Sequence, residues 1–243
     1  KARASSGLLF YTPDAIDANA QPAAGSMNWV VALLAALVGV FTLWLALRLY
    51  RWDPAPAAGR PTPSLIGIRG GLLLPAFAML VTPLGLGLGM WSSVGSYSAE
   101  TWARVTVPSS DAYHALWAPL LLLELVANIT QLGLALLVAV LFFKRRSSAP
   151  RLYIALMVYM VIVQAVDVAL ALQLERGAGV DLDLQPNDWI RGAFSIVIWV
   201  AYFLRSERVR STFTRQLSPP AVARELAPEP DVSGFPSAHQ IAR

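Results

Sequence analysis

The sequence contains no cysteine and only two histidines, His114 and His239. Without cysteine the chain cannot form a disulfide, a thiolate metal site or a cysteine nucleophile. Two histidines are too few for a histidine-based metal cluster. The chain also shows no combined set of nucleophile, base and orienting group, and no cofactor-binding loop. We therefore expect a protein that is not an enzyme and that holds no metal and no cofactor.

Charge is also scarce, because only 14% of the 243 residues are charged whereas soluble domains carry about 25%. Hydrophobic residues make up 56% of the chain, and the charges avoid the long apolar blocks. This pattern predicts a polytopic membrane protein rather than one or two soluble domains. A net charge of +4 would suggest a nucleic-acid partner in a soluble chain. In a membrane protein it reflects basic residues kept on one side, so we expect no nucleic acid.

Five blocks are long enough to cross a hydrocarbon core about 30 Å thick, which takes roughly 20 helical residues. The sequence therefore predicts an all-α, polytopic integral membrane protein with five transmembrane helices. The last block is short, at 16 residues, and should borrow interfacial residues on the Arg205 side. The predicted spans are residues 28–50, 70–91, 117–143, 152–174 and 189–204.

Basic residues are distributed unevenly around these spans. Fourteen of the 19 lie in segments that an odd number of crossings places on one side, whereas the other side holds five basic and eight acidic residues. Lysine and arginine accumulate in cytoplasmic loops, so we expect the N-terminus outside and the C-terminus in the cytoplasm. The cytoplasmic rim, which could also bind anionic lipid head groups, would include Lys144, Arg145, Arg146, Arg205, Arg208 and Arg210.

Polar residues interrupt two of the predicted spans. Glu124, Asn128 and Gln131 are spaced i, i+4, i+7 and so share one helical face. Gln164 and Asp167 form a second polar stripe in the fourth span. A charge near the bilayer centre costs roughly 2.5 to 3.5 kcal/mol. We therefore expect both stripes to face the interior of the helix bundle.

The two carboxylates should lie at similar depth in the outer half of the membrane. Glu124 and Asp167 are each about 10 Å from the outer end of their span, at 1.5 Å per residue. Arg191 stands at the outer entrance of the fifth span, with a side chain long enough to reach down. We expect one carboxylate to pair with Arg191 and the other to be protonated or bonded to an amide. The cluster either holds helices together or forms a proton or ion site or a polar head-group pocket.

Two glycines in the second span, Gly85 and Gly89, form a small-xxx-small pair. Such a pair lets two helix backbones approach closely. We therefore predict that Gly85 and Gly89 contribute to helix packing.

Four sequence blocks stand out: "IRGGLLLPAFAMLVTPL" at 68–84, "LLLLELVANITQLGLALLVAVLFFKRR" at 120–146, "APRLYIALMVYMVIVQAVDVAL" at 149–170 and "WVAYFLRSERVRSTF" at 199–213. Together they resemble the bacterial membrane proteins of domain of unknown function family 2569. The resemblance covers roughly residues 66 to 215, and the last block is the most specific because its polar and aromatic residues match at fixed spacing. Leu72 and Leu73 depart from the tryptophan-led pair usual in the family. The resemblance implies a four-helix unit in a bacterial inner membrane and brings no known reaction.

Together these patterns divide the chain into five parts. The linker is rich in proline and alanine and reads as extended, and the tail lacks hydrophobic periodicity, which predicts disorder unless a partner holds it. The parts are an extracytoplasmic segment 1–27, an extra transmembrane helix 28–50, a cytoplasmic linker 51–65, a four-helix membrane domain 66–215 and a cytoplasmic tail 216–243.

Two functions from different classes follow. The leading hypothesis is a non-catalytic accessory or structural subunit that packs against other integral membrane subunits within the lipid bilayer. The alternative is a small transporter or proton-coupled or ion-coupled protein that uses Glu124, Asp167 and Arg191. A lipid-binding or envelope-stress role, resting on the basic rim, has less support.

Overall fold

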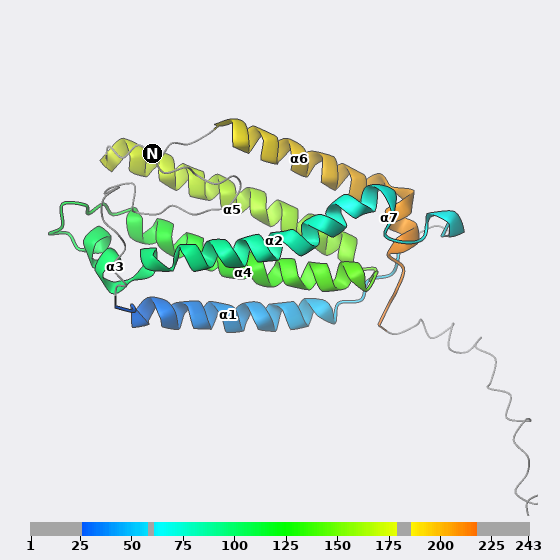
Figure 1. Cartoon of the computed structure of the whole chain (residues 1–243), viewed down its shortest axis with the longest axis horizontal. Coiled ribbons are helices and arrows are strands. Elements are labelled where there is room, and N and C mark those ends of the chain that lie inside the picture. The colour runs from blue at the N-terminus through cyan, green and yellow to red at the C-terminus, as the bar shows by residue number, and fades with distance from the viewer. Residues whose placement is uncertain (1–25, 58–60, 179–185, 218–243) are drawn as a thin grey trace, which may run out of the picture.

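A computed structural model describes residues 26–57, 61–178 and 186–217, and this part of the chain contains helices and no β-strand. The long helices lie side by side (Figure 1). Residues 1–25 of the predicted N-terminal segment and 218–243 of the predicted tail lie outside the described residues. The α-helices are α1 Trp29–Tyr50, α2 Leu73–Ser92, α3 Ala99–Thr106, α4 Trp117–Phe143, α5 Ala149–Ala178, α6 Pro186–Arg205 and α7 Glu207–Thr212, and the 3-10 helices are η2 Pro63–Leu65, η3 Gly70–Leu72 and η4 Val94–Tyr97.

The all-α fold predicted from the sequence is confirmed, and its apolar helices indicate a multi-pass membrane protein. α4 coincides with the predicted third span, while α5 and α6 run a few residues beyond the predicted fourth and fifth. Among the described residues a shorter apolar helix, Phe194–Arg205, corresponds to the fifth predicted crossing. The fifth crossing and the orientation stay predictions. The four helices long and apolar enough to cross a membrane are Trp29–Tyr50, Pro63–Ser92, Trp117–Phe143 and Ala149–Gly177.

Helix α4 is the central element of the bundle. α1, α2 and α5 all pack against it, whereas α6 packs against α5 (Figure 1). Half of the most apolar part of α4 is buried, compared with 11% in α1. The protein therefore buries its polar intramembrane stripe on the helix that has the most neighbours.

Short capping sequences decide where several helices begin. The Asn28 side chain accepts hydrogen bonds from the backbone N–H groups of Val30 and Val31, at 3.2 and 3.3 Å, which satisfies two donors that the first turn of α1 leaves free. Ser206 caps α7 in the same way by accepting from Val209 N at 3.4 Å. The N-terminal helix is thus fixed by its sequence at Asn28.

The segment between the second and third spans is more ordered than the sequence suggested. The spans predicted from the sequence leave residues 92–116 as an outer loop, yet this segment contains η4 and α3. Ser98 caps α3 by accepting from Thr101 N at 3.2 Å. α3 then packs against α4, with Val105 buried and Trp102 partly buried at the contact. A helix of two turns is too short to show a membrane-length pattern, so its signal was only the capping serine.

The interior is divided into two apolar clusters, one at each end of the bundle. The cluster at the α3 end includes Trp117, Leu121 and Leu174. The larger cluster, at the α7 end, includes Phe142 and Phe213, whose rings are tilted to each other with centroids 5.0 Å apart. The polar stripe of α4 lies between these two clusters.

Candidate functional site

The polar residues predicted to face inward do face inward. On α4, Glu124, Asn128 and Gln131 are all buried, with 2%, 3% and 5% of their surface exposed. On α5, Asp167 is 1% exposed, whereas Gln164 is only partly buried. The bundle therefore collects three polar side chains of α4 and one carboxyl of α5 in its interior, as a membrane environment demands.

The register of α4 against α5 places the two acidic residues at one level. Gln131 and Ala135 of α4 line one cavity with Leu156 and Met160 of α5, so these parts of the two antiparallel helices lie side by side. Because the helices are antiparallel, moving a number of residues toward the start of α4 corresponds to moving the same number toward the end of α5. We infer from this spacing that Glu124 and Asp167 lie near the same level, and the depth estimated from the sequence stays a prediction.

A tyrosine from η4, Tyr97, lies near Glu124. Tyr97 belongs to the apolar cluster with Trp102 and Leu170. Burial raises the pKa of the Tyr97 phenol, and the charge of Glu124 raises it further. The phenol therefore stays protonated and lies within electrostatic range of Glu124. The sequence placed Tyr97 in an outer loop and gave no sign of this contact.

The surroundings of the two carboxyl groups differ. Glu124 and Asn128 both interact with neighbouring groups. Asp167 has one carboxyl oxygen, Oδ1, that is buried and makes no hydrogen bond within the described part of the chain. Arg191 lies on α6, but its side chain is outside the described residues, so the predicted pair with a carboxylate stays a prediction.

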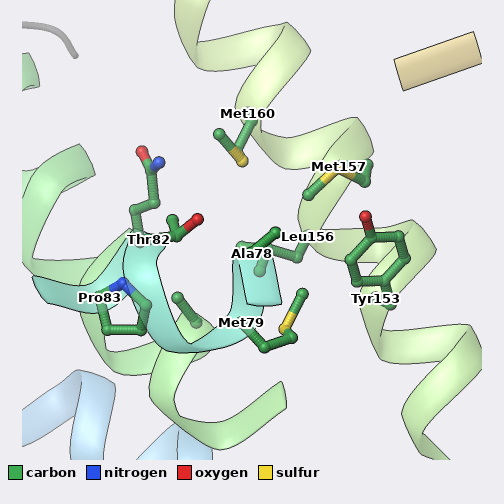
Figure 2. Close-up of a pocket in the computed structure, with 10 residues that line it drawn as sticks. Ala78, Met79, Thr82, Pro83, Tyr153, Leu156, Met157 and Met160 are labelled. Atoms are coloured by element: carbon green, nitrogen blue, oxygen red, sulfur yellow. The ribbon is translucent and has the colours of Figure 1, made fainter. Parts of the chain in front are cut away.

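Below the acidic level, a partly open cavity of about 70 Å³ lies between α2 and α5, with α4 as its floor. Three of the five methionines of the chain line it. Met79 on α2 stands across the space from Met157 and Met160 on α5 (Figure 2). Polar atoms reach the cavity from three helices, and the lining residues are Ala78, Met79, Thr82, Pro83, Gln131, Ala135, Tyr153, Leu156, Met157 and Met160.

Close packing of α1 on α4 centres on a glycine that the sequence did not single out. A Cβ at Gly133 would collide with the methyl group of Thr42, so the two backbones approach as only glycine allows. Thr42 is 3% exposed, and its hydroxyl lies 3.5 Å from that of Thr130. The signal that could have found this contact is a lone glycine in the apolar run of α4.

The glycines predicted to pack helices behave differently. A Cβ at Gly85 would meet nothing within 4 Å, so no helix of the described chain approaches it closely. Gly85 lies on a face of α2 that turns away from α4. The predicted role of Gly85 and Gly89 in helix packing therefore stays a prediction.

At the α7 end, three segments far apart in the sequence meet: residues 50–55, 144–151 and 211–217, which we call the latch. Their backbones are joined directly, because Ser147 N donates to the carbonyl of Arg215 at 2.9 Å. The latch ties α1 and the linker after it to the α4–α5 turn and to the segment after α7. The linker predicted to be extended is thus partly docked.

A buried arginine holds the latch together. Nη2 of Arg146 donates to Oδ1 of Asp53 at 3.2 Å, and the guanidinium lies 5.3 Å from the centroid of the Tyr50 ring. Oδ2 of Asp53 accepts from Leu217 N at 2.6 Å. Nζ of Lys144 donates to the Tyr50 hydroxyl at 2.8 Å. The linker after α1, the α4–α5 turn and the last described residue, Leu217, therefore converge on one ion pair.

The predicted basic rim divides into two kinds of residue. Arg146 is 4% exposed and its cation is used inside the chain, so it cannot serve as a head-group contact. The sequence places Arg146 in one basic run with Lys144 and so predicts the same exposure for both. The chain turns sharply at Arg145, where φ is 55°, and this turn directs Arg146 inward. The other rim residues reach the surface: Lys144, Arg205 and Arg210 are exposed, and Arg145 and Arg208 are partly buried.

The glycine-rich start of α2 and the aromatic end of α6 also meet at this end. A Cβ at Gly71 would lie 2.9 Å from the Tyr202 hydroxyl. Gly67 N donates to Oγ1 of Thr212 at 3.1 Å. Tyr153 and Phe203 stack with centroids 4.2 Å apart. The blocks "IRGG" and "WVAYFLRSERVRSTF", distant in sequence, are thus one contact in space.

Within the described residues, no three histidine, aspartate or glutamate side chains gather in a way that could hold a metal ion. The polar groups can form hydrogen bonds between helices and can bind or release protons. The geometry thus supports helix association and proton binding.

Comparison with known proteins gives one match. No curated protein and no solved structure matches the chain. A family model covers residues 65–214, which include α2 to α7 and leave α1 outside. The covered part contains both the buried polar stripe and the contact between the start of α2 and the end of α6. The chain belongs to the family described as Protein of unknown function (DUF2569).

Proposed function

We propose that this protein is a non-catalytic subunit of the bacterial inner membrane that packs against a transmembrane helix of another membrane protein. The observation that carries the proposal is the groove between α2 and α5. These two helices pack against α4 rather than against each other, which leaves the cavity at Gln131 partly open. The groove is therefore a gap in the bundle that something in the membrane must cover.

The chemistry of the groove favours a helix over a lipid chain. Thr82, Gln131 and Tyr153 bring two hydroxyl groups and an amide to a lining that is otherwise apolar. A lipid tail offers no hydrogen-bonding group, whereas Ser, Thr, Asn or Gln on a neighbouring helix does, at about 0.6 to 2 kcal/mol for each bond. Met79 and Met157 add flexible thioethers, which adapt to the shape of a partner.

The face of α2 beside the groove suits the same role. Leu84 and Leu88 are exposed, at 68% and 71%. Gly85 offers a notch between them, since a Cβ there would meet nothing within 4 Å. A partner helix could thus approach α2 closely and reach the polar groups of the groove from one side.

Photo-crosslinking in native membranes tests this proposal. A photoreactive residue is placed in the groove at Thr82 or Met157. The control position is Val40 on α1, which is 67% exposed. We expect both groove positions to capture the same membrane protein after mild detergent extraction, and Val40 to capture lipid alone. Mass spectrometry of the size-exclusion peak identifies the partner and its ratio to this chain.

Two results would reject the subunit function. One is a chain that elutes alone, with only lipid crosslinked at Thr82 and Met157. The other is capture of one protein equally from Val40 and from the groove, since contact would then be independent of the groove. Covalent capture of a second copy of this chain at Thr82 would replace the accessory subunit with a homo-oligomer.

The proposal includes five crossings with the N-terminus outside, supported by the distribution of basic residues. The absence of native cysteine allows a direct test with one introduced thiol at a time. Ser109, after α3, and Ser64, in η2, are both exposed serines. A membrane-impermeant maleimide should label S109C on intact spheroplasts and S64C only after the membrane is opened. The reverse pattern would invert the topology.

A further inference from the structure

Asp167 on α5 is buried in the bundle, in surroundings that disfavour the ionised form of its carboxyl group. It is 1% exposed, and Oδ1 has no hydrogen-bond partner within the described residues. Transferring a charged carboxylate into apolar surroundings is costly unless a cation or several donors compensate. The Asp167 side chain can avoid this cost by taking up a proton.

The groups that face Asp167 do not supply an obvious counter-ion. From α4, Glu124 lies at the same level and is itself 2% exposed. From η4, Tyr97 contributes a neutral phenol. On α5, the nearest polar neighbour is Gln164, one turn away and uncharged. On α6, the Arg191 side chain lies outside the described residues.

Among the other helices, α3 packs against α4 and carries Glu100, which is exposed and accepts from Ser26, and Arg104, which interacts with neighbouring groups. α2 contains no charged residue, and α1 has none before Arg48, at its far end. Two carboxyl groups at one level also disfavour each other's ionisation, because like charges in a low-dielectric interior repel. A proton on one of them relieves both the burial cost and the repulsion.

We propose that Asp167 is a proton-binding site inside the membrane, with Glu124 as the neighbouring second carboxyl. The proton comes from the aqueous medium and adds to the Asp167 carboxylate, which becomes a neutral carboxylic acid. No other bond forms or breaks. The site goes beyond helix packing, because polar groups that only join helices need not exchange a proton with the medium.

Infrared difference spectroscopy of the full chain in proteoliposomes tests the site. Aspartate labelled with ¹³C at the side-chain carboxyl identifies the aspartate bands, and Asp167 is the one aspartate in the four long apolar helices. At neutral pH we expect a C=O stretch of a protonated carboxylic acid that shifts with the label. The band should be lost as the pH is raised and return as the pH is lowered.

Variants assign the band to one residue. Asp167→Asn should abolish it, while Asp111→Asn, at an exposed aspartate outside the long helices, should leave it unchanged. Glu124→Gln should retain the band but shift its titration, since the neighbouring carboxyl is gone. If Asp167→Asn does not fold, the ¹³C shift in the wild-type chain still identifies the protonated aspartate.

Three results would overturn the proposal. One is a spectrum at neutral pH with no protonated band that responds to the aspartate label. Another is a labelled band that survives Asp167→Asn in folded protein. The third is a band whose loss at constant pH follows added Na⁺, which would make the site a cation site instead.

Discussion

The two ends of α1 are held in different ways. At its Tyr50 end, the latch uses the buried pair of Arg146 and Asp53, whose side chains are 5% and 18% exposed. At its other end, Ser26 donates from its hydroxyl and its backbone N–H to an exposed carboxylate, Glu100, at 2.8 and 3.0 Å. Removing one partner of a buried pair leaves an uncompensated charge, whereas exposed contacts contribute little. We infer that α1 is anchored at the latch and only steadied at Ser26.

Asp167 extends this comparison to the membrane interior. Arg146 and Asp167 are almost equally buried, at 4% and 1%, yet only Arg146 has an opposite charge within ion-pair distance among the described residues. A paired buried charge fixes one geometry. A buried carboxyl without a described counter-ion is instead free to change its protonation state. The latch thus serves structure, while Asp167 is the better candidate for a change of state.

The largest expected effect comes from breaking the latch. Arg146→Ala leaves Asp53 without its cation and removes the contact with the Tyr50 ring. We expect the variant to lose about 3 kcal/mol of stability, the lower end for a broken buried pair. Thermal unfolding in a mild detergent measures the loss.

The control for this prediction is Arg205→Ala, at an exposed arginine of the same end. It should unfold with the wild-type midpoint. The paired change Asp53→Ala and Arg146→Ala should recover part of the loss, because no lone charge then stays buried. Equal midpoints for Arg146→Ala and Arg205→Ala would show that the latch contributes nothing beyond a surface contact.

A smaller effect is expected midway along α1, where no charge is involved. Gly133→Ala adds a methyl group that collides with the Thr42 side chain. Overpacking of this kind costs about 2 kcal/mol, and the unfolding midpoint should fall accordingly. Gly39→Ala, on α1 with nothing within 4 Å of its Cβ, is the matched control and should cause no loss.

A rescue variant makes the cause specific. Thr42→Ala removes the methyl group that blocks the new side chain, so the double variant should recover most of the stability. Equal unfolding midpoints for Gly133→Ala and Gly39→Ala would show that the close contact between α1 and α4 does not stabilise the position of α1. The latch alone would then hold α1 in place.

The sequence predicted the long helices well because their apolar length is a strong signal in itself. It also predicted the inward face of α4, since Glu124, Asn128 and Gln131 repeat with the helical period and a membrane penalises them elsewhere. These successes need only local spacing and the cost of burying polar groups.

What the sequence missed depends on pairing between distant segments. Arg146 lies in a basic run that satisfies the positive-inside pattern, and nothing local reveals that Asp53, 93 residues earlier, reaches it. The role of Gly133 likewise becomes visible only from its contact with Thr42 on α1. The spacing of Gly85 and Gly89 did not predict a contact within the described chain. Such a spacing identifies a helix face that can pack closely, but it does not identify which helix packs there.

At the latch end, a third variant probes the contact between the start of α2 and the end of α6. Gly71→Ala brings a Cβ to 2.9 Å from the Tyr202 hydroxyl. We expect a loss of about 1 kcal/mol, the low end for overpacking, because only the tip of Tyr202 has to move. Gly85→Ala, in the same segment with open space around it, should leave the unfolding midpoint unchanged.

Tyr202→Phe supplies the check on this interpretation. Removing the hydroxyl should restore the stability of Gly71→Ala. A loss that persists in the double variant would trace the effect to the backbone of η3 rather than to contact with α6.

The smallest effect is expected where α1 begins, and it depends on pH. Hydrogen bonds from Ser26 lower the pKa of Glu100 below its ordinary value, so the folded state favours the carboxylate. Their contribution is therefore fully present above the ordinary pKa of a glutamate and is lost as the pH falls through the lowered value. Glu100→Gln should remove this pH dependence.

Amide hydrogen exchange at Ala99 reports the contact, because Ala99 N donates to the carbonyl of Ser26 at 2.9 Å. In the wild type, protection of Ala99 relative to the unfolded chain should weaken in acid, while the amides of α4 stay protected. Glu207→Gln, at the start of α7, is the matched control and should keep the wild-type response. If acid released α1 along its whole length, the Ser26 end would be an anchor comparable to the latch, and the contrast between the two ends would fail.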